Sequence, residues 1–270
     1  MAWEWRRGQY TKYLTIPEWE EVRVEIGFSS RNGGVSKRPF DSLNLGLHVG
    51  DLEQDVLENR RRFWAEWDAA QNDSILGEQV HDNKVVWAGK DDRGRGAMEL
   101  GTAIAGVDGM LTRETGLGLM AFFADCLPIY FLHPVLKVIG LAHAGWKGTV
   151  GQIGLRVIEM LAASGGEPGD CWVAIGPGIG SCCYEVDERV ANLFRSQIKS
   201  GTCLVESRPG HYRLDLAQVN REMLIRAGVT EEHIWSIDLC TACRPADFFS
   251  YRRDGGTTGR MAAWIRRQEG

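Results

Sequence analysis

The sequence has few histidines and prolines and lacks a long uninterrupted hydrophobic run. Six histidines and eight prolines occur among 270 residues, and the most apolar stretch, 117–132, is interrupted by Asp125 and Pro128. That stretch is too short and too polar to cross a bilayer, and the first residues lack the apolar segment of a signal peptide. We therefore expect a cytoplasmic protein that does not bind a membrane.

The chain also lacks a strong excess of charge of either sign. Its formal net charge is −5, with 25% charged and 44% hydrophobic residues. This composition is typical of a globular protein that buries a core, and it excludes disordered and coiled-coil classes. A mildly acidic chain gives no argument for a nucleic-acid partner. Its composition leaves the oligomeric state undetermined.

No internal repeat, low-complexity segment or long linker divides the chain, so we expect a single domain over residues 1–270. The hydrophobic pattern predicts strands at 22–28, 74–80, 84–87, 117–124, 138–143, 171–175, 234–239 and 261–265. Helices are predicted after Asp51 as an N-cap, after Thr149, and at about 187–197 and 216–227. Several predicted strands follow one another without a helix between them, so the sheets should be mixed. The expected fold class is α+β, with mixed β-sheets flanked by helices in a layered α/β sandwich.

The seven cysteines are an odd number, which favours free thiols over a disulfide framework. Cys240 and Cys243 form a lone CxxC pair, and a structural zinc site would need a second pair of ligands that we do not find in range. We predict two half-buried thiols near a turn. His48, His133 and His211 have turn-like neighbours and are predicted to be exposed to solvent.

Polar side chains interrupt or end three apolar runs. His81 and His143 close two of them, and Cys126 interrupts the most apolar run in the chain. A thiol and two imidazoles delivered from three strand ends could hold one zinc ion and leave a fourth position open. The separations match no short zinc motif, so a buried thiol beside two partly exposed histidines is the alternative. Asp125 could orient a ligand, transfer a proton or hydrogen-bond the backbone.

Glycine-rich turns suggest an anion site. The turn 144–149 lies between a predicted strand and a predicted helix and contains Lys147, so its N–H groups could face a phosphate. Arg31 precedes another glycine-rich turn and could bind phosphate oxygens, or it could be an ordinary solvent-exposed arginine. The segment 250–254 is either the polar wall of a site or an ion-paired surface strand.

Together these motifs resemble the laccase-domain family, which is also described as a multicopper polyphenol oxidase family and as a purine nucleoside phosphorylase family. The resemblance extends from about Gly27 to Met261 and consists of the segments 27–36, 42–51, 79–81, 124–128, 143–149, 175–186, 249–254 and 258–261. Asp82 stands where glycine is common in the family, which puts the substrate preference in doubt.

The resemblance implies a zinc-dependent purine nucleoside phosphorylase that acts on adenosine, inosine and S-methyl-5′-thioadenosine and also deaminates adenosine. The family's metal ligands fall on His81, Cys126 and His143, and the expected catalytic residues are Cys126, His143 and Asp125. Arg31 sits where a family arginine faces the pocket, and we expect it to bind phosphate together with Lys147. The expected partners are purine nucleosides and phosphate.

Two other enzyme classes remain as alternatives. A copper-dependent polyphenol oxidase with a mononuclear and a coupled copper site would need more histidines than six, and the sequence has no HxH pair. One copper ion could still occupy the predicted site in vitro. A cysteine hydrolase would use Cys126 as nucleophile and His143 as base. A structural zinc module would need four protein ligands, and only three candidates converge.

Overall fold

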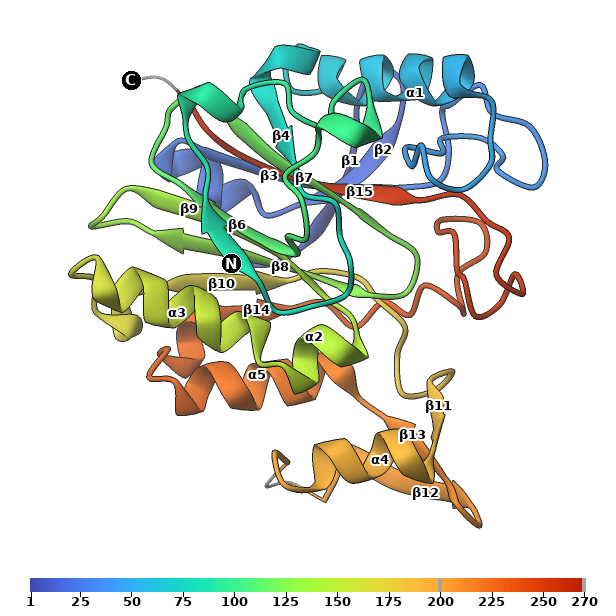
Figure 1. Ribbon diagram of the computed structural model, residues 1–270, viewed down its shortest axis with the longest axis vertical. Helices are drawn as coiled ribbons and strands as arrows, with labels where there is room; N and C mark the ends of the chain where they lie inside the picture. The colour runs from blue at the N-terminus through green and yellow to red at the C-terminus, as the bar shows by residue number, and fades with distance from the viewer. Residues whose placement is uncertain (199–200, 269–270) are drawn as a thin grey trace.

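The computed structural model describes residues 1–198 and 201–268, and two six-stranded sheets that face each other form its centre (Figure 1). The strands are β1 Glu4–Arg7, β2 Lys12–Thr15, β3 Val24–Ser29, β4 Ser74–Leu76, β5 Val85–Trp87, β6 Gly109–Thr112, β7 Gly118–Phe123, β8 Leu127–His133, β9 Val138–Ala144, β10 Trp172–Ile175, β11 Glu185–Asp187, β12 Leu204–Arg208, β13 His211–Leu214, β14 Ile234–Ser236 and β15 Met261–Arg267. The helices are α1 Glu53–Ala65, α2 Trp146–Val150, α3 Ile153–Ala163, α4 Glu188–Arg195 and α5 Leu216–Arg226. Short 3-10 helices lie at Pro17–Val22, Gln71–Asp73, Lys90–Asp92, Leu100–Thr102, Pro168–Asp170 and Glu231–His233.

Both large sheets are mixed, as predicted. The first has the order β1-β2-β3-β15-β7-β4, and the second has the order β14-β10-β8-β9-β6-β5. The pairs β4–β7, β5–β6 and β10–β14 are parallel, whereas the other pairs in these sheets are antiparallel. The predicted α+β fold class with sheets flanked by helices is therefore confirmed.

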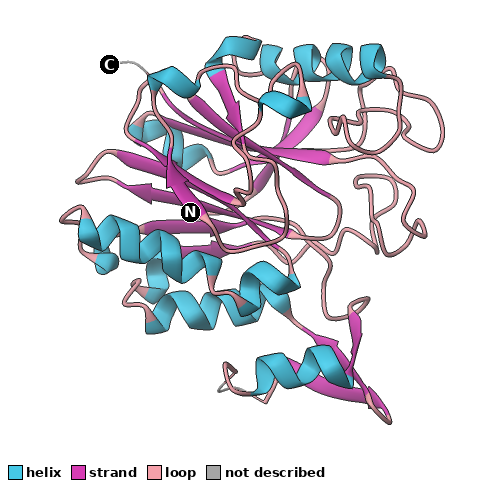
Figure 2. Cartoon of the chain, viewed as in Figure 1, coloured by secondary structure: helices cyan, strands magenta, loops and turns pink. Residues whose placement is uncertain are grey.

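Alternating side chains on the strands build a four-layer sandwich. On β7, Phe123 points into the core between the two sheets, while Phe122 points to the opposite face, which α1 covers. On β8, Tyr130 joins the same central core, and Phe131 faces the layer of α3 and α5. This period of two is expected when both faces of a strand are buried. Figure 2 shows the helices outside and the strands inside.

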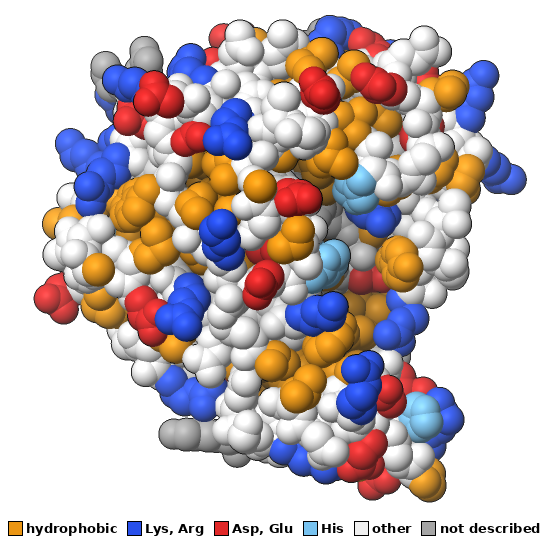
Figure 3. All heavy atoms as spheres, viewed as in Figure 1, with side chains coloured by type: hydrophobic (Ala, Val, Ile, Leu, Met, Phe, Trp, Pro, Cys, Tyr) orange, Lys and Arg blue, Asp and Glu red, His pale blue; other side chains and the backbone are white. Residues whose placement is uncertain are grey.

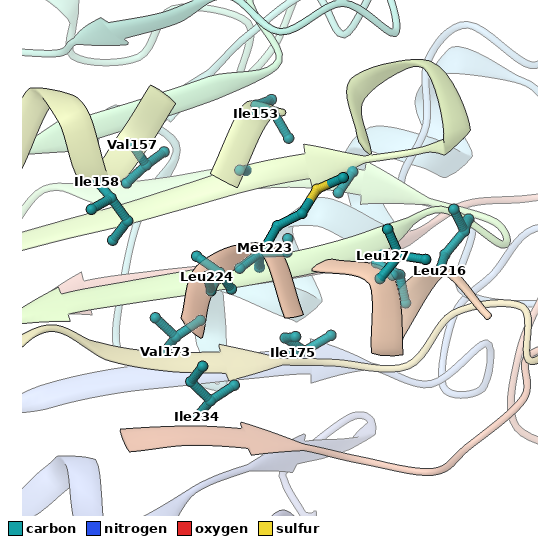
Figure 4. Close-up of a cluster of buried hydrophobic side chains, with 14 of the residues drawn as sticks. Leu127, Ile153, Val157, Ile158, Val173, Ile175, Leu216, Met223, Leu224 and Ile234 are labelled. Carbon is teal, nitrogen blue, oxygen red and sulfur yellow. The ribbon is translucent and has the colours of Figure 1, made fainter. Parts of the chain in front are cut away.

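The outer helices bury their apolar faces on the second sheet. Figure 4 shows side chains of α3 and α5 directed toward the strands of this sheet, with Leu224 of α5 close to Val173 of β10 and with Val157 and Ile158 of α3 over the neighbouring strands. A third sheet, in the order β11-β13-β12, lies with α4 at one end of the molecule (Figure 1). No helix in the described ranges has both the length and the apolar character that a membrane span requires.

Several boundaries differ from the sequence predictions. The strand expected over 74–80 ends at Leu76, because Gln79 and His81 have positive φ angles of 59° and 63°, which a strand does not accommodate. Asp51 is not the N-cap of α1, because Leu52 occupies that position. The Asp51 carboxylate instead accepts a hydrogen bond from the N–H of Leu52. The pattern missed β8 altogether, because Pro128 interrupts it, yet β8 is completely buried.

Candidate metal centre and substrate pocket

Three potential metal ligands meet where strands of both sheets end. His81 follows β4, Cys126 lies between β7 and β8, and His143 is near the end of β9. Their ligand atoms all lie within 4.8 Å of one another, and the two imidazole centroids are 4.8 Å apart. The antiparallel register that pairs Pro128 with His143 brings Cys126 beside this histidine. The structure thus brings together the three residues that the motifs singled out.

Asp108, which the sequence analysis missed, organises this site. Its carboxylate oxygen Oδ1 lies 2.8 Å from Nδ1 of His143, so the other ring nitrogen, Nε2, is left for a ligand. The same carboxylate accepts backbone N–H bonds from Val80, His81 and Asp82 at 2.9–3.0 Å. A carboxylate behind a histidine fixes the ring orientation in many metal sites. The only sequence signal was an acidic residue directly before an apolar strand, β6.

The loops that hold the site adopt unusual backbone conformations. Gln79, His81 and Asp125 all have positive φ angles, and that of Asp125 is 93°. Non-glycine residues in this region are strained, and such strain persists where surrounding contacts impose it. Here the Gln79 side-chain amide accepts a hydrogen bond from the Phe122 N–H and donates one to the Phe122 C=O, each at 2.8 Å. The backbone is therefore held so that His81 and Cys126 face one another.

A close backbone approach completes the site. A Cβ atom on Gly145 would lie 2.7 Å from Sγ of Cys126 and 3.4 Å from Cδ2 of His81. Only glycine therefore fits at this position without displacing the thiol. This explains the glycine that follows β9 in the motif 143–149.

The Cys126 thiol and the His143 imidazole shift each other's pKa in opposite directions. Burial alone would raise the pKa of Cys126, but the nearby His143 and His81 outweigh it and lower that pKa to about 6. Burial would lower the pKa of His143, but the thiolate of Cys126 and the carboxylate of Asp108 raise it to about 9. Without a metal, the pair is therefore a thiolate beside an imidazolium at neutral pH.

These residues line a cavity of about 590 Å³. Its wall consists of His48, Glu78, Gln79, His81, Leu100, Phe122, Ala124, Asp125, Cys126, His143, Trp146, Lys147, Ile179, Tyr184, Tyr251, Arg252 and Arg260. A cavity of this volume suits a small-molecule ligand. Figure 3 shows a hollow near the middle of this face with histidine and basic side chains around it. The wall combines aromatic surface with positive charge.

The predicted anion-binding residues divide between two places. Lys147 lines the cavity, with its ammonium 5.7 Å from the ring centroid of Trp146. Arg31 does not line it: the Arg31 guanidinium donates to the carbonyl oxygens of Asp41 and Pro245 in a separate depression. Arg31 therefore lies outside the described cavity, because backbone carbonyls hold its side chain elsewhere, and its role in binding phosphate stays a prediction.

The segment 250–254 supplies both of the features that its sequence suggested. Tyr251 and Arg252 line the cavity, while Arg253 forms an ion pair with Asp254 at 2.7 Å. The segment is a turn and not a strand. Arg260, which the sequence analysis did not single out, also lines the cavity, with its guanidinium 5.9 Å from the Tyr251 ring centroid.

Asp125 is bound from two sides. Its Oδ1 accepts a hydrogen bond of 2.6 Å from the Thr241 hydroxyl, and its Oδ2 accepts one of 2.7 Å from the Arg252 N–H. Asp82 does not reach the cavity wall, and its carboxylate accepts the N–H of Asn83. The residue that departs from the family pattern therefore does not change the charge of the described wall.

His133 differs from the prediction that it is exposed to solvent, whereas His48 is exposed as predicted. His133 is buried, and its Nε2 lies 3.2 Å from the Glu167 carbonyl oxygen. His48 keeps an exposed surface but lines the cavity near Phe122. The surrounding protein atoms and the positive charges of Arg260 and Arg60 lower the pKa of His48 to about 4.

The prediction that Cys240 and Cys243 have no second pair of ligands in range is also wrong. The loop between β10 and β11 places Cys182 and Cys183 against them, and the four sulfur atoms lie within 4.8 Å of one another. The two pairs are far apart in sequence, so spacing alone could not reveal the cluster.

The chain matches known proteins over nearly its full length. Residues 25–268 match the family model described as multi-copper polyphenol oxidoreductase laccase. The protein named purine nucleoside phosphorylase YlmD from Geobacillus stearothermophilus is 48% identical over 252 residues, which cover 90% of each chain. The protein of the same name from Bacillus subtilis is 40% identical, covering 95% of each chain. A purine nucleoside phosphorylase from Deinococcus radiodurans is 41% identical, covering 90% of this chain and 89% of that one.

Solved structures agree with this similarity. The crystal structure of YlmD from Geobacillus stearothermophilus superimposes with a TM-score of 0.94 and 43% identity, covering 98% of this chain and 99% of that one. A Bacillus licheniformis structure described as hypothetical protein YfiH superimposes with a TM-score of 0.93 and 40% identity, covering 97% and 98%. The fold is thus shared with these proteins.

Proposed function

Because this chain belongs to the multi-copper polyphenol oxidoreductase laccase family, whose similar members carry the name purine nucleoside phosphorylase, we propose that it is a zinc-dependent purine nucleoside phosphorylase. The observation that carries the proposal is the convergence of His81, Cys126 and His143 in the wall of a cavity large enough for a nucleoside. The proposed substrates are adenosine, inosine and S-methyl-5′-thioadenosine, each with phosphate.

The donor set suits zinc. Two imidazole nitrogens and one thiolate are ligands that zinc prefers, and Asp108 supplies the carboxylate that often supports a metal-bound histidine. We propose that His81, Cys126 and His143 hold the ion. When bound by three protein ligands, zinc keeps one position for substrate or water and polarises the group that binds there.

The wall of the cavity supplies the other two requirements of phosphorolysis. In this reaction a phosphate oxygen forms a bond to C1′ while the bond from C1′ to the purine nitrogen breaks, and the purine leaves with that electron pair and takes up a proton. Lys147, Arg252 and Arg260 provide positive charge to hold the phosphate in line. The aromatic rings of Phe122, Tyr184 and Tyr251 offer apolar faces for the purine and sugar.

We assign Asp125 a positioning role instead of the proton transfer predicted from sequence. Both of its carboxylate oxygens accept hydrogen bonds, from Thr241 and from the Arg252 backbone. These bonds draw the loop that carries Arg252 toward the loop that carries Cys126. We also propose that the same cavity deaminates adenosine, in which water replaces the amino group at C6 and ammonia leaves.

The two alternative enzyme classes have less support. Of the described histidines, only His81 and His143 share a metal-binding group, which is too few imidazoles for a multicopper oxidase. Cys126, His143 and Asp108 also resemble the triad of a cysteine hydrolase. A triad has no use for His81, however, and this third donor favours a metal.

The proposal is tested by incubating the purified protein with each nucleoside, with and without phosphate. We expect free purine and ribose 1-phosphate (or its methylthio analogue) only when phosphate is present, and inosine with ammonia from adenosine in either case. Cys126→Ser should lose the metal of this site and lower kcat/KM by at least about 100-fold, because a neutral hydroxyl is a poor zinc ligand.

Circular dichroism of the Cys126→Ser protein should match that of the wild type, which separates a lost ligand from a lost fold. If Cys126→Ser keeps this metal but loses all turnover, the thiol acts as a nucleophile and the hydrolase mechanism applies. Purine release that does not depend on phosphate would refute the phosphorylase assignment.

A further inference from the structure

Four thiols from two distant loops converge at one point outside the catalytic cavity. Cys182 and Cys183 lie in the loop between β10 and β11, and Cys240 and Cys243 lie in the loop after β14. Sγ of Cys243 is 3.5 Å from Sγ of Cys182 and 3.3 Å from Sγ of Cys183, and all four sulfur atoms lie within 4.8 Å of one another.

Backbone contacts hold the two loops together independently of the thiols. The Thr241 N–H donates to the Gly178 carbonyl at 2.9 Å, within a parallel bridge that pairs Gly178 with Cys240. Within the first loop, the Cys183 N–H donates to the Gly180 carbonyl at 2.9 Å. The four thiols are therefore brought together by the fold itself.

A glycine allows this approach. A Cβ atom on Gly180 would lie 3.2 Å from Cβ of Cys240 and 3.3 Å from Sγ of Cys182. These distances are tighter than ordinary packing, so a larger residue would push the two pairs of cysteines apart. The backbone is thus shaped around the cluster.

The spacing of the sulfur atoms fits one tetrahedral ion. In a zinc site with Zn–S bonds of about 2.3 Å, neighbouring sulfur atoms lie about 3.8 Å apart. The separations of 3.3 Å, 3.5 Å and at most 4.8 Å bracket this value. An iron–sulfur cluster is larger than a single ion and would hold its four thiolates further apart.

We propose that Cys182, Cys183, Cys240 and Cys243 form a second metal site that binds one structural zinc ion. Four protein ligands leave no position for water or substrate, which is the coordination of a structural site and not of a catalytic one. The alternative use of four neighbouring thiols is disulfide formation. A disulfide joins only two of them, however, whereas Cys243 contacts both Cys182 and Cys183.

The two loops that the ion would join form part of the catalytic cavity. Ile179 and Tyr184 of the first loop line its wall. Thr241, which lies between the two cysteines of the second loop, donates to Asp125 at 2.6 Å. A zinc ion at the cluster would therefore fix the position of this wall without taking part in the reaction. The proposal does not depend on which reaction the cavity catalyses.

The test is to count metal ions by mass spectrometry in protein produced with zinc. We expect about two zinc ions per chain in the wild type and about one in Cys126→Ser, in Cys243→Ser and in the double variant Cys182→Ser/Cys240→Ser. Cys203→Ala is the matched control, because Cys203 belongs to neither group of ligands, and it should retain about two.

A second measurement does not require the cluster to be altered. In the Cys126→Ser protein, once a chelator has removed its zinc and the chelator itself has been dialysed away, added Co²⁺ should produce the intense thiolate-to-cobalt absorption of a tetrahedral four-thiolate site, and added zinc should abolish it. Four thiols should react with a thiol reagent only after chelation. Absence of the cobalt absorption, or recovery of these cysteines as disulfides from freshly purified protein, would overturn the proposal, as would unchanged zinc content in the Cys243→Ser protein.

Discussion

Asp108 contributes to the metal centre through other residues, because it contacts both His143 and the backbone that carries His81. One carboxylate oxygen orients the His143 ring at 2.8 Å, and the carboxylate accepts three backbone N–H bonds from residues 80–82. Its charge is retained because the interaction with His143 and the N–H bonds outweigh burial and lower the pKa of Asp108. One side chain thus positions two of the three proposed ligands.

The variant Asp108→Asn should weaken zinc binding at this centre by about 10- to 100-fold, which is the usual effect of losing such a support. The measurement is the zinc concentration that restores half-maximal phosphorolysis after chelation. Asp82→Asn is the matched control, because the Asp82 carboxylate accepts a hydrogen bond only from the N–H of Asn83 among the described contacts. An equal effect of both substitutions would mean that Asp108 has no specific role.

The paired titration of Cys126 and His143 predicts how zinc affinity depends on pH. Without metal, Cys126 has a pKa of about 6 and His143 one of about 9, so at pH values between these two the thiol is ionised and the imidazole is protonated. Zinc must then displace the proton on His143, and its affinity should rise about tenfold per pH unit over this range. Below it, Cys126 also binds a proton and the dependence should become steeper.

This dependence is measured by competition with a chelator in the Cys243→Ser background, where only the catalytic centre is expected to bind zinc. An affinity that does not change between the two pKa values would show that His143 is already neutral before the metal binds.

At the scale of elements, α1 attaches the long loops of the molecule to the first sheet. Arg60 of α1 is fully buried, and its guanidinium donates to the carbonyl oxygens of Leu45, Gly96 and Ala97 at 2.6–2.8 Å. It also lies 4.5 Å from the ring centroid of Phe122, which lines the catalytic cavity. Burial lowers the pKa of Arg60 to about 9.

The variant Arg60→Met should destabilise the protein by about 2 kcal/mol, because three buried carbonyl oxygens lose their donor. Arg61→Met is the matched control: Arg61 is the next residue of the same helix, is exposed, and pairs with Glu58 on the surface. It should leave the denaturation midpoint unchanged. Urea unfolding of both variants is the measurement, and equal midpoints would show that the Arg60 contacts contribute nothing net.

At the scale of the whole molecule, the buried members of the hydrophobic core are residues other than the proposed metal ligands, although Cys126, Cys183 and Cys240 pack against its edges. Three clusters of buried side chains fill the space between the two sheets and beneath the helices on either side. A chain of this length buries enough apolar surface to fold without a metal. The metals therefore shape the loops at the end of the sandwich, not its layers.

Complete chelation should accordingly abolish phosphorolysis while the far-ultraviolet circular dichroism stays close to that of the metal-loaded protein. The melting temperature should fall, because an ion that binds only the folded state stabilises it, and added zinc should restore both the melting temperature and activity. Loss of the helical and strand signal on chelation would show instead that the metals are required for folding.

The amino-acid sequence by itself determined the class of the fold and singled out the three residues proposed as central ligands. Hydrophobic periodicity identified α3, α5 and most strands of the two large sheets, because local side-chain spacing reports which faces are buried. The motifs around His81, Cys126 and His143 predicted the candidate metal centre whose three side chains the structure brings together. Periodicity failed at β8, where Pro128 interrupts the pattern, and at the end of β4, where tertiary contacts impose positive φ angles.

Only the tertiary structure decided which distant residues meet. Asp108 reaches His143 because β6 pairs with β9, and backbone carbonyls hold Arg31 away from the cavity. The adjacent pair Cys182–Cys183 and the pair Cys240–Cys243 converge because Gly178 pairs with Cys240 across two loops. Contacts of this kind depend on strand register and loop path, which are properties of the whole packed chain and leave no signal in the spacing of the residues.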